Sequence, residues 1–257
     1  MIKWQKAYLQ LANGRVFEGL APEWQTQDSY GEVVFNTGMT GYEETLTDPS
    51  YSGQILTFTF PILGNYGVSD GKRWESPEIH VKGVVCETVF ETPSHYSAQK
   101  SFLAWLQEHN IPLICGVDTR ELTKVIREYG VLSGVITVNP DLVAEFKDSM
   151  ALNWVELVSP KAVVTTGNGK HKVIVVDCGA KENILRCLEQ FDLTIKRVPF
   201  DYDYTHEDYD GVMLSNGPGD PKQCATTAAI LAKALQSNKP IFGICLGSQL
   251  MALAIGS

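Results

Sequence analysis

The sequence predicts an α/β protein with two domains: an α+β domain followed by a doubly wound parallel sheet. Its 257 residues exceed one typical domain and suit two, each with its own core. The first half mixes strand, turn and helix patterns without strict alternation, which is typical of an α+β domain. The second half alternates strands and helices, and repeated β-α-β units imply a parallel sheet with ligand sites at the carboxyl ends of its strands.

The composition excludes several classes of protein. Hydrophobic residues make up 44% of the chain and charged residues 20%, as in a soluble globular protein. The net charge of -9 argues against a nucleic-acid partner. We expect neither a signal peptide nor a membrane span, because the N-terminus lacks an apolar core and no run of about 18 apolar residues occurs. The six cysteines show no C-x-x-C spacing, and five are expected to be buried, reduced thiols of a cytoplasmic protein.

Three local patterns define the first half. A hairpin with a type I′ turn is predicted around Asn13 and Gly14. A helix is predicted within residues 97–110, and another begins near Asp118, whose carboxylate caps it while Glu121 completes a capping box. The apolar face of this second helix would consist of Leu122, Val125, Ile126 and Tyr129.

A change in amino-acid composition marks the predicted domain boundary. Residues 159–170 are rich in small, polar and turn-forming types, so a linker is predicted there, between domains 1–158 and 171–257. Beyond it, almost continuous apolar runs indicate strands buried on both faces, and helical patterns lie between them.

A cysteine lies at the turn from the last strand into the last helix. The segment Gly243-Ile244-Cys245-Leu246-Gly247 has the G-x-nucleophile-x-G spacing of a nucleophile elbow. A thiolate at Cys245 would be favoured by the helix N-terminus, and the N–H of Leu246 could donate to an oxyanion. The plainer alternative is a small residue packed at a strand-helix junction, but the flanking glycines favour the elbow.

A glycine-rich loop follows the preceding strand, at the same predicted sheet edge. Ser215-Asn216-Gly217-Pro218-Gly219 exposes backbone N–H groups that suit a second oxyanion donor and a small polar ligand. Alternatively, the loop is only a tight turn, with Asp220 as helix N-cap and Pro221 as the first helical residue. Both interpretations can hold together.

The two motifs together resemble the class I glutamine amidotransferases, in which a cysteine attacks the side-chain amide of glutamine and releases ammonia. The resemblance implies that Cys245 is the nucleophile and that Gly217 and Leu246 are the oxyanion donors. It also places Gly219 and Gln249 among the residues that bind glutamine. The fold would then end in a partial amidotransferase domain.

Residues 36–67 and 116–130 of the first half, and residues 177–186 of the second, resemble the small-subunit family of carbamoyl-phosphate synthetases, and the resemblance covers essentially the whole chain. That resemblance implies that Ser50 reaches the glutamine site, although by itself Ser50 would read as a turn residue. It also implies a heterodimer with a large subunit that uses ammonia, ATP, Mg and bicarbonate to make carbamoyl phosphate for arginine and pyrimidine synthesis. No cofactor is expected in this chain, which has no Walker-type phosphate loop. The N-terminal domain would supply much of the docking surface.

The chain departs from the family in two places. Ser248 stands where histidine or asparagine is common, which is expected to matter little. More seriously, the family's catalytic histidine and glutamate are expected beyond Ser257, and none of the five histidines matches that base. We therefore expect the chain to be inactive or nearly so as a glutaminase. The alternatives are a non-catalytic docking protein derived from that subunit and an unrelated cysteine hydrolase, which would leave the first half unexplained.

Overall fold

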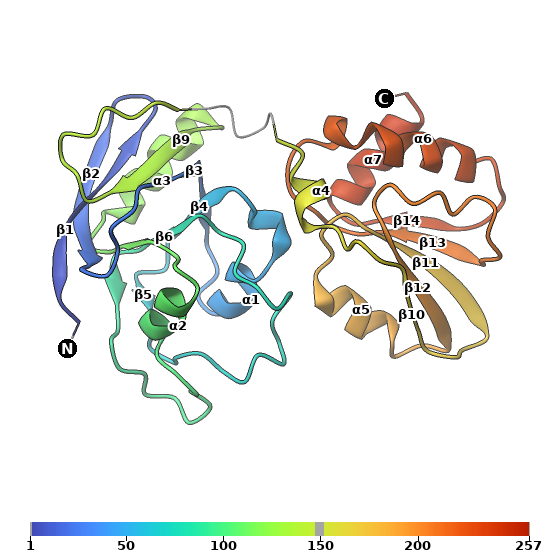
Figure 1. Cartoon of the computed structure of the whole chain (residues 1–257), viewed down its shortest axis with the longest axis horizontal. Coiled ribbons are helices and arrows are strands. Elements are labelled where there is room, and N and C mark those ends of the chain that lie inside the picture. Colours follow the sequence, from blue (N-terminus) through green and yellow to red (C-terminus); the bar gives the residue numbers. More distant parts are fainter. Residues whose placement is uncertain (1, 147–151, 257) are drawn as a thin grey trace. The chain divides into compact units, whose positions relative to one another are not determined.

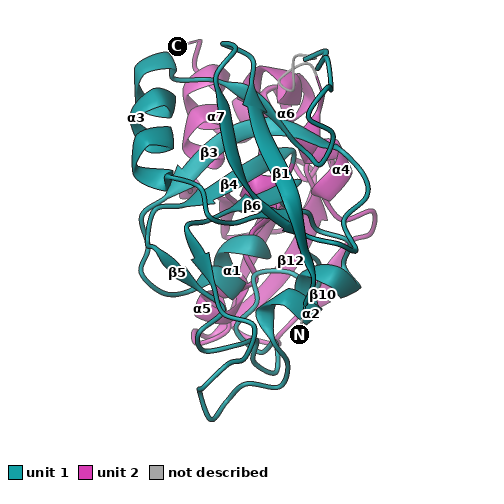
Figure 2. Ribbon diagram, turned by 90° about the vertical axis from the view of Figure 1, so that its left-hand side faces the viewer, with its two compact units in different colours: residues 1–47, 53–149 teal, residues 48–52, 150–257 magenta. Residues whose placement is uncertain are grey.

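The computed structural model describes residues 2–146 and 152–256 and divides the chain into two compact units (Figure 1). Unit 1 comprises Met1–Thr47 and Gly53–Ser149, and unit 2 comprises Asp48–Ser52 and Met150–Ser257. Figure 2 colours the two units separately. The short segment 48–52 therefore belongs to unit 2, although the chain on either side of it belongs to unit 1.

Unit 1 is built on a mixed seven-stranded sheet with the order β2-β1-β9-β3-β4-β6-β8. The pairs along β2-β1-β9-β3 are antiparallel, and those along β3-β4-β6-β8 are parallel. A bridge between Leu20 at the end of β2 and Cys115 just after β8 joins the two outer strands. The strands are β1 (Trp4–Leu11), β2 (Val16–Pro22), β3 (Ser29–Asn36), β4 (Gln54–Phe58), β6 (Gly83–Val85), β8 (Leu113–Ile114) and β9 (Ser133–Thr137), with a separate parallel pair β5 (Ile62–Leu63) and β7 (Thr88–Val89).

The predicted hairpin is confirmed, but its predicted turn type is wrong. β1 and β2 pair antiparallel, and the N–H of Leu11 donates to the carbonyl of Arg15. Gly14 has φ 86°, whereas Asn13 is not among the residues with positive φ. A type I′ turn needs positive φ at both central residues. The structure instead has a three-residue loop in which only the glycine adopts the left-handed conformation.

One of the two predicted helices of unit 1 is shorter than its pattern indicated, and the other has the predicted bounds. The predicted helix within 97–110 is α2 (Phe102–Glu108), which begins after Ser101, whose hydroxyl accepts the N–H of Ala104. In α3 (Thr119–Tyr129), Asp118 accepts the N–H of Glu121 as predicted, but the Glu121 side chain pairs with Arg15 instead of completing the capping box. Tyr129 is 55% exposed, so it does not belong to the buried face. The remaining described helix of unit 1 is α1 (Tyr42–Leu46).

Unit 2 contains a five-stranded, mostly parallel sheet with the order β10-β12-β11-β13-β14. The four strands from β12 to β14 are parallel, and β10 is antiparallel at one edge. The strands are β10 (Val164–Thr166), β11 (His171–Asp177), β12 (Leu193–Pro199), β13 (Gly211–Leu214) and β14 (Ile241–Gly243). The helices are α4 (Trp154–Val158), α5 (Glu182–Leu188), α6 (Ala225–Ala234) and α7 (Leu246–Ala254), with short 3₁₀ turns η1 (Pro49–Tyr51) and η3 (Pro221–Cys224).

Alternate residues of β11 face two separate hydrophobic clusters. Ile174 and Val176 pack with residues of α6 and α7, whereas Val175 packs with Leu185 of α5. Because successive strand residues point to opposite faces, the sheet is covered by helices on both sides. Figure 1 shows α5 on one side of the sheet and α6 and α7 on the other. This arrangement confirms the predicted doubly wound fold.

The two compact units divide elsewhere than at the predicted boundary of 158. Val155 of α4 lies in the main core cluster of unit 2, so this helix belongs to the second unit. The segment 159–170, predicted as a linker, includes β10, which pairs with residues 195–197 of β12. Polar and turn-forming residues occur there because an edge strand exposes its side chains, and all three residues of β10 are exposed.

Candidate active site at the carboxyl edge of the unit 2 sheet

Cys245 occupies a strained turn between β14 and α7. Its backbone has φ 51° and ψ -108°, and its side chain is exposed. Positive φ is uncommon for a residue with a Cβ atom, and such conformations persist only where the surroundings impose them. Here the N–H of Ile244 donates to the carbonyl of Leu214, which continues the β13–β14 ladder up to the turn. The structure thus has the geometry of the predicted nucleophile elbow.

The glycines on either side of Cys245 are required by close backbone contacts. A Cβ atom at Gly243 would lie 2.6 Å from the carbonyl carbon of Gly247. A Cβ atom at Gly247 would lie 2.5 Å from the carbonyl oxygen of Leu214. Both distances are far below van der Waals contact, so only glycine allows the helix to start directly against the end of the sheet.

The glycine-rich loop lies against the elbow, as predicted. The N–H of Gly247 donates to the carbonyl of Ser215 (3.1 Å). A Cβ atom at Gly217 would lie 2.8 Å from the Leu246 side chain and 2.2 Å from the carbonyl oxygen of Cys178. The structure therefore brings together Gly217 and Leu246, the two predicted oxyanion donors.

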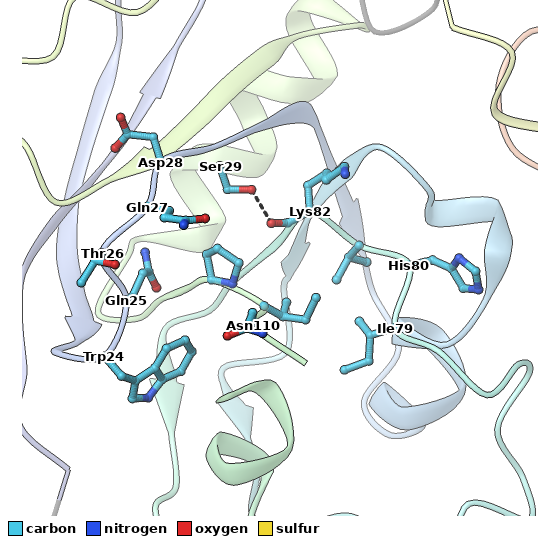
Figure 3. A pocket seen from close by; sticks show the side chains of 13 residues that line it. Trp24, Gln25, Thr26, Gln27, Asp28, Ser29, Ile79, His80, Lys82 and Asn110 are labelled. Carbon is cyan, nitrogen blue, oxygen red and sulfur yellow. Dashed lines mark hydrogen bonds between the residues drawn. The ribbon is translucent and has the colours of Figure 1, made fainter. Parts of the chain in front are cut away.

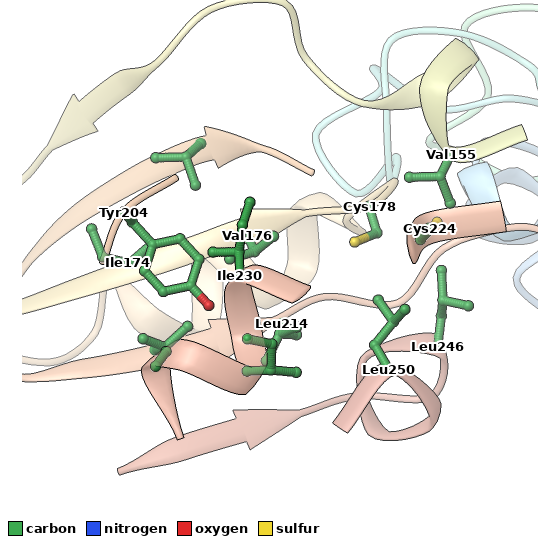
Figure 4. Packing of buried hydrophobic residues seen from close by; sticks show 14 of the residues in the cluster. Val155, Ile174, Val176, Cys178, Tyr204, Leu214, Cys224, Ile230, Leu246 and Leu250 are labelled. Carbon is green, nitrogen blue, oxygen red and sulfur yellow. The ribbon is translucent and has the colours of Figure 1, made fainter. Parts of the chain in front are cut away.

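The N–H groups of these two residues are available for a ligand. Within residues 2–146 and 152–256, neither N–H has a hydrogen-bond acceptor. Leu246 buries its side chain with Leu214 and Leu250 (Figure 4), which anchors the first turn of α7. A helix N-terminus carries partial positive charge, so an anion would be stabilised there.

Ser50 also lies at this loop, in segment 48–52 of unit 2. The side-chain NH₂ of Asn216 donates to Ser50 Oγ (2.9 Å). The N–H of Ser50 donates to Asp48 Oδ1, which caps η1, and Asp48 Oδ2 forms an ion pair with Lys181 Nζ (2.8 Å). A residue from the first quarter of the sequence is thereby held next to Gly217.

The two other predicted ligand residues are accessible. Gln249 is exposed in the first turn of α7, and its N–H donates to the carbonyl of Cys245 (3.2 Å). Gly219 is exposed with φ +79°, and Trp154 of α4 lies beside it. Asp220 and Pro221 begin η3 as predicted, with Asp220 Oδ1 accepting the N–H of Lys222. The glutamine-binding roles of Gly219, Gln249 and Ser50 stay predictions.

Sequence reasoning missed the polar residues that assemble the site. Asp177 accepts the N–H groups of Gly179 and Ala180 and forms an ion pair with Arg197. This turn is connected to Ser50 by Asn216, which donates to the carbonyl of Gly179 and to Ser50 Oγ. A second connection is the ion pair between Lys181 and Asp48. These polar residues lie inside or next to the sequence motifs described above, which could have drawn attention to them. No spacing rule, however, indicates which of them form hydrogen bonds or ion pairs with one another.

The cysteines differ sharply in their environment. Burial raises the pKa of Cys224 to about 11, and burial also raises the pKa of Cys178. These thiols, with Cys86 and Cys115, are buried, whereas Cys187 and Cys245 are exposed. The prediction that five cysteines are buried is therefore wrong for Cys187, because the α5 face that carries it points away from the core.

Among the described residues, no hydrogen bond joins either histidine of unit 2 to Cys245. His171 begins β11, at the opposite end of the parallel strands from Cys245, and lies 3.7 Å from Asp210. His206 is exposed in the segment between β12 and β13. The remaining three histidines belong to unit 1.

A separate cavity of about 590 Å³ lies in unit 1 (Figure 3). Its wall includes Trp24, Asp28, His80, Lys82 and Asn110. It contains none of the predicted site residues. In the described part of the chain, no cluster of three or more His, Cys, Asp or Glu residues is suited to bind a metal ion, and no helix is long and apolar enough to span a membrane.

Comparisons with known proteins assign this arrangement to a family. Residues 9–136 match the family model described as carbamoyl-phosphate synthase small chain, CPSase domain, and residues 174–257 match glutamine amidotransferase class-I. The carbamoyl phosphate synthase small chain of Caldanaerobacter subterraneus is 42% identical over 98% of this chain and 70% of its own length. The chain belongs to the family of carbamoyl phosphate synthase small chains.

Other relatives support the assignment. The small chain of Listeria monocytogenes is 45% identical over 98% of this chain and 71% of its own length. The arginine-specific small chain of Neurospora crassa is 42% identical over 98% of this chain and 59% of its own length. The predicted fold class is confirmed, since a mixed-sheet small-chain domain precedes a mostly parallel amidotransferase domain that contains Cys245.

Proposed function

We propose that this small chain hydrolyses the side-chain amide of glutamine through a thioester on Cys245. One observation carries the proposal: an exposed cysteine on a strained elbow lies beside two backbone donors, Gly217 and Leu246, whose N–H groups have no acceptor in the described structure. Such donors stabilise the oxyanion that forms when a nucleophile attacks an amide carbonyl.

The reaction would proceed in two stages. The Cys245 thiolate attacks the amide carbon, and the oxyanion is held by the N–H groups of Gly217 and Leu246. The C–N bond then breaks, the nitrogen takes up a proton and leaves as ammonia, and a glutamyl thioester remains on Cys245. Water attacks the thioester, and its proton goes to the departing thiolate or to solvent as glutamate is released.

Proton transfer is the weak step for the residues described. General acid–base catalysis contributes about 10²–10⁴-fold, and neither His171 nor His206 is placed to supply it. We therefore propose that the chain by itself turns over glutamine slowly or not at all. Hydrolysis by this chain at a rate typical of a complete amidotransferase would contradict this part.

The partner and pathway follow from the family. We propose that the ammonia passes to a large synthetase subunit, bound in part by unit 1, which uses ATP, Mg and bicarbonate to form carbamoyl phosphate. Relatives carry names such as carbamoyl phosphate synthase arginine-specific small chain and multifunctional protein pyr1-3, consistent with arginine and pyrimidine synthesis. A cytoplasmic location and the lack of a cofactor in this chain belong to the same proposal.

The test is labelling with a glutamine-analogue chloroketone, followed by mass spectrometry of the modified peptides. Cys187 is the internal control, because it is the other exposed cysteine of the described chain. We expect selective labelling of Cys245 that glutamine blocks. Equal labelling of Cys187 and Cys245, or labelling that glutamine does not block, would refute the glutamine site and leave the non-catalytic docking role.

A further inference from the structure

Hydrogen bonds of the Asn216 side chain join Ser50 to the glycine-rich loop. It is 3% exposed, and both ends of its amide are used. Its NH₂ donates to Ser50 Oγ (2.9 Å) and to the carbonyl of Gly179 (3.0 Å), with Asp48 Oδ1 at 3.4 Å. Its Oδ1 accepts the N–H of Lys181 (3.0 Å). The loop that carries Gly217 and the segment that carries Ser50 are thus linked through one amide.

The orientation of this amide is determined by backbone groups that cannot exchange roles. A carbonyl such as that of Gly179 only accepts, and the N–H of Lys181 only donates. Reversing the Asn216 amide would place oxygen against oxygen and NH₂ against N–H. The NH₂ group must therefore face Gly179, and the same group meets Ser50 Oγ.

This orientation decides how Ser50 can bind a ligand. A serine hydroxyl has one hydrogen to donate and lone pairs that accept. Because Asn216 donates to Ser50 Oγ, the Ser50 hydrogen has to point elsewhere, and within residues 2–146 and 152–256 no acceptor takes it. Ser50 is only partly buried, so a ligand at this edge of the sheet could take that hydrogen.

We propose that Asn216 is a positioning residue that sets Ser50 as a hydrogen-bond donor to an acceptor oxygen of the bound glutamine. The inference rests on the proposed glutaminase site. It adds the direction of one hydrogen bond, the one between Ser50 and the substrate. Ser50 then recognises an oxygen of the substrate, and its hydroxyl is not an acceptor for the substrate's ammonium group.

The surroundings of Asn216 keep this geometry rigid. Asp48 is 3% exposed and holds the N–H of Ser50 on one oxygen and Lys181 Nζ on the other. Asp177 accepts the N–H of Gly179, which fixes the turn whose carbonyl receives Asn216. Ser50 is therefore held from both its backbone and its side chain, and Asn216 controls the side chain.

The first variant is Asn216→Asp, which keeps the shape of the side chain but replaces the NH₂ donor by an oxygen that faces Ser50 Oγ, the carbonyl of Gly179 and Asp48 Oδ1. The Ser50 hydrogen would then turn to residue 216 and be lost to the substrate. We expect glutamine to protect Cys245 from the chloroketone about tenfold less well, as for the loss of one hydrogen bond to substrate. Alkylation of Cys245 by iodoacetamide without glutamine is measured alongside, because Asn216 precedes Gly217 in the loop that lies against the elbow, and the protection by glutamine is compared after correction for this intrinsic thiol reactivity.

Coupling separates this positioning role from a general structural one. Ser50→Ala should weaken protection by a similar factor, and the double variant should be no weaker than Asn216→Asp alone, because both remove the same contact. Asn139→Asp, which makes the same charge change at an exposed residue of unit 1, should bind glutamine as the unaltered chain does. Additive losses in the double variant, or normal protection in Asn216→Asp, would overturn the inference.

A second pair of variants covers the case in which Asn216→Asp does not fold. Ser50→Thr keeps the hydroxyl and should retain protection, whereas Ser50→Ala should lose about tenfold. Equal protection in the two would refute the donor role. If glutamine does not block labelling of Cys245 in the unaltered chain, the proposed function itself fails. If glutamine blocks labelling equally well in the unaltered chain and in Asn216→Asp, only the role of Asn216 fails.

Discussion

Replacing Cys245 by glycine or alanine would measure the strain stored at the elbow. Both substitutions remove the thiol, but only alanine keeps a Cβ atom at φ 51° and ψ -108°. Such a conformation costs a residue with a Cβ of the order of 1–3 kcal/mol, and glycine little. Glycine also gains freedom in the unfolded chain, which opposes its advantage by about 0.4–1 kcal/mol. We expect unit 2 with Cys245→Gly to be more stable than unit 2 with Cys245→Ala, by about 1 kcal/mol.

The buried cysteines provide an assay that reads each unit separately. A short pulse of thiol reagent at each urea concentration would label Cys178 and Cys224 only when unit 2 unfolds, and Cys86 and Cys115 only when unit 1 does. With a typical urea dependence, about 1 kcal/mol moves the unit 2 midpoint by roughly 0.5–1 M. The unit 1 midpoint should stay where it is.

An ordinary helical position supplies the matched control. Ala252 lies inside α7, where Ala252→Gly should destabilise unit 2 by about 1 kcal/mol. The preference between glycine and alanine thus has opposite signs at positions 245 and 252. If Cys245→Ala were as stable as Cys245→Gly, or more stable, the cysteine would not be strained and the elbow argument would be wrong.

Three further predictions concern stability and association. Gly247→Ala should destabilise unit 2 by about 1–3 kcal/mol in urea unfolding, because its Cβ would lie 2.5 Å from the Leu214 carbonyl oxygen, and a gain would contradict the contact. Burial raises the pKa of Cys224 from 9.0 to about 11, so the unfolded thiol ionises first. The free energy of unfolding should therefore fall as pH rises from 9 to 11, by at most about 1.4 kcal/mol per pH unit from this thiol. Cys224→Ala should reduce that slope in circular-dichroism unfolding curves, and an unchanged slope would exclude this thiol as a cause. Phe242 is 61% exposed on the outer strand β14, so the chain should self-associate as its concentration rises in sedimentation velocity, and Phe242→Asp should lower that association. No association, or unchanged association in the variant, would exclude this surface.

Much of the fold could be predicted from local patterns. The Asp118 cap, the alternation of strands and helices in unit 2, and the η3 start at Asp220 were all predicted correctly. Each depends on a few neighbouring residues whose chemistry satisfies the backbone locally. The errors lie where tertiary packing decides: Tyr129 continues an apolar helical pattern, yet the core ends one turn earlier.

The turn at Asn13 and Gly14 shows the same limit. The dipeptide favours a two-residue hairpin loop, but the pairing of Leu11 with Arg15 sets a longer loop in which only the glycine has positive φ. The register of a hairpin depends on which faces of both strands are buried, and the turn residues alone do not specify it.

The elbow could be predicted from the sequence by itself, because its close backbone contacts require glycine at two nearby positions of the chain. Gly243 and Gly247 are glycines since any Cβ there would meet backbone atoms, and the cysteine between them marks the nucleophile. Only the tertiary structure decided that Ser50 meets Asn216, a residue 166 positions away. A hydrogen bond between distant segments needs a donor and an acceptor at one point in space, and it imposes no spacing or periodicity on the chain that joins them.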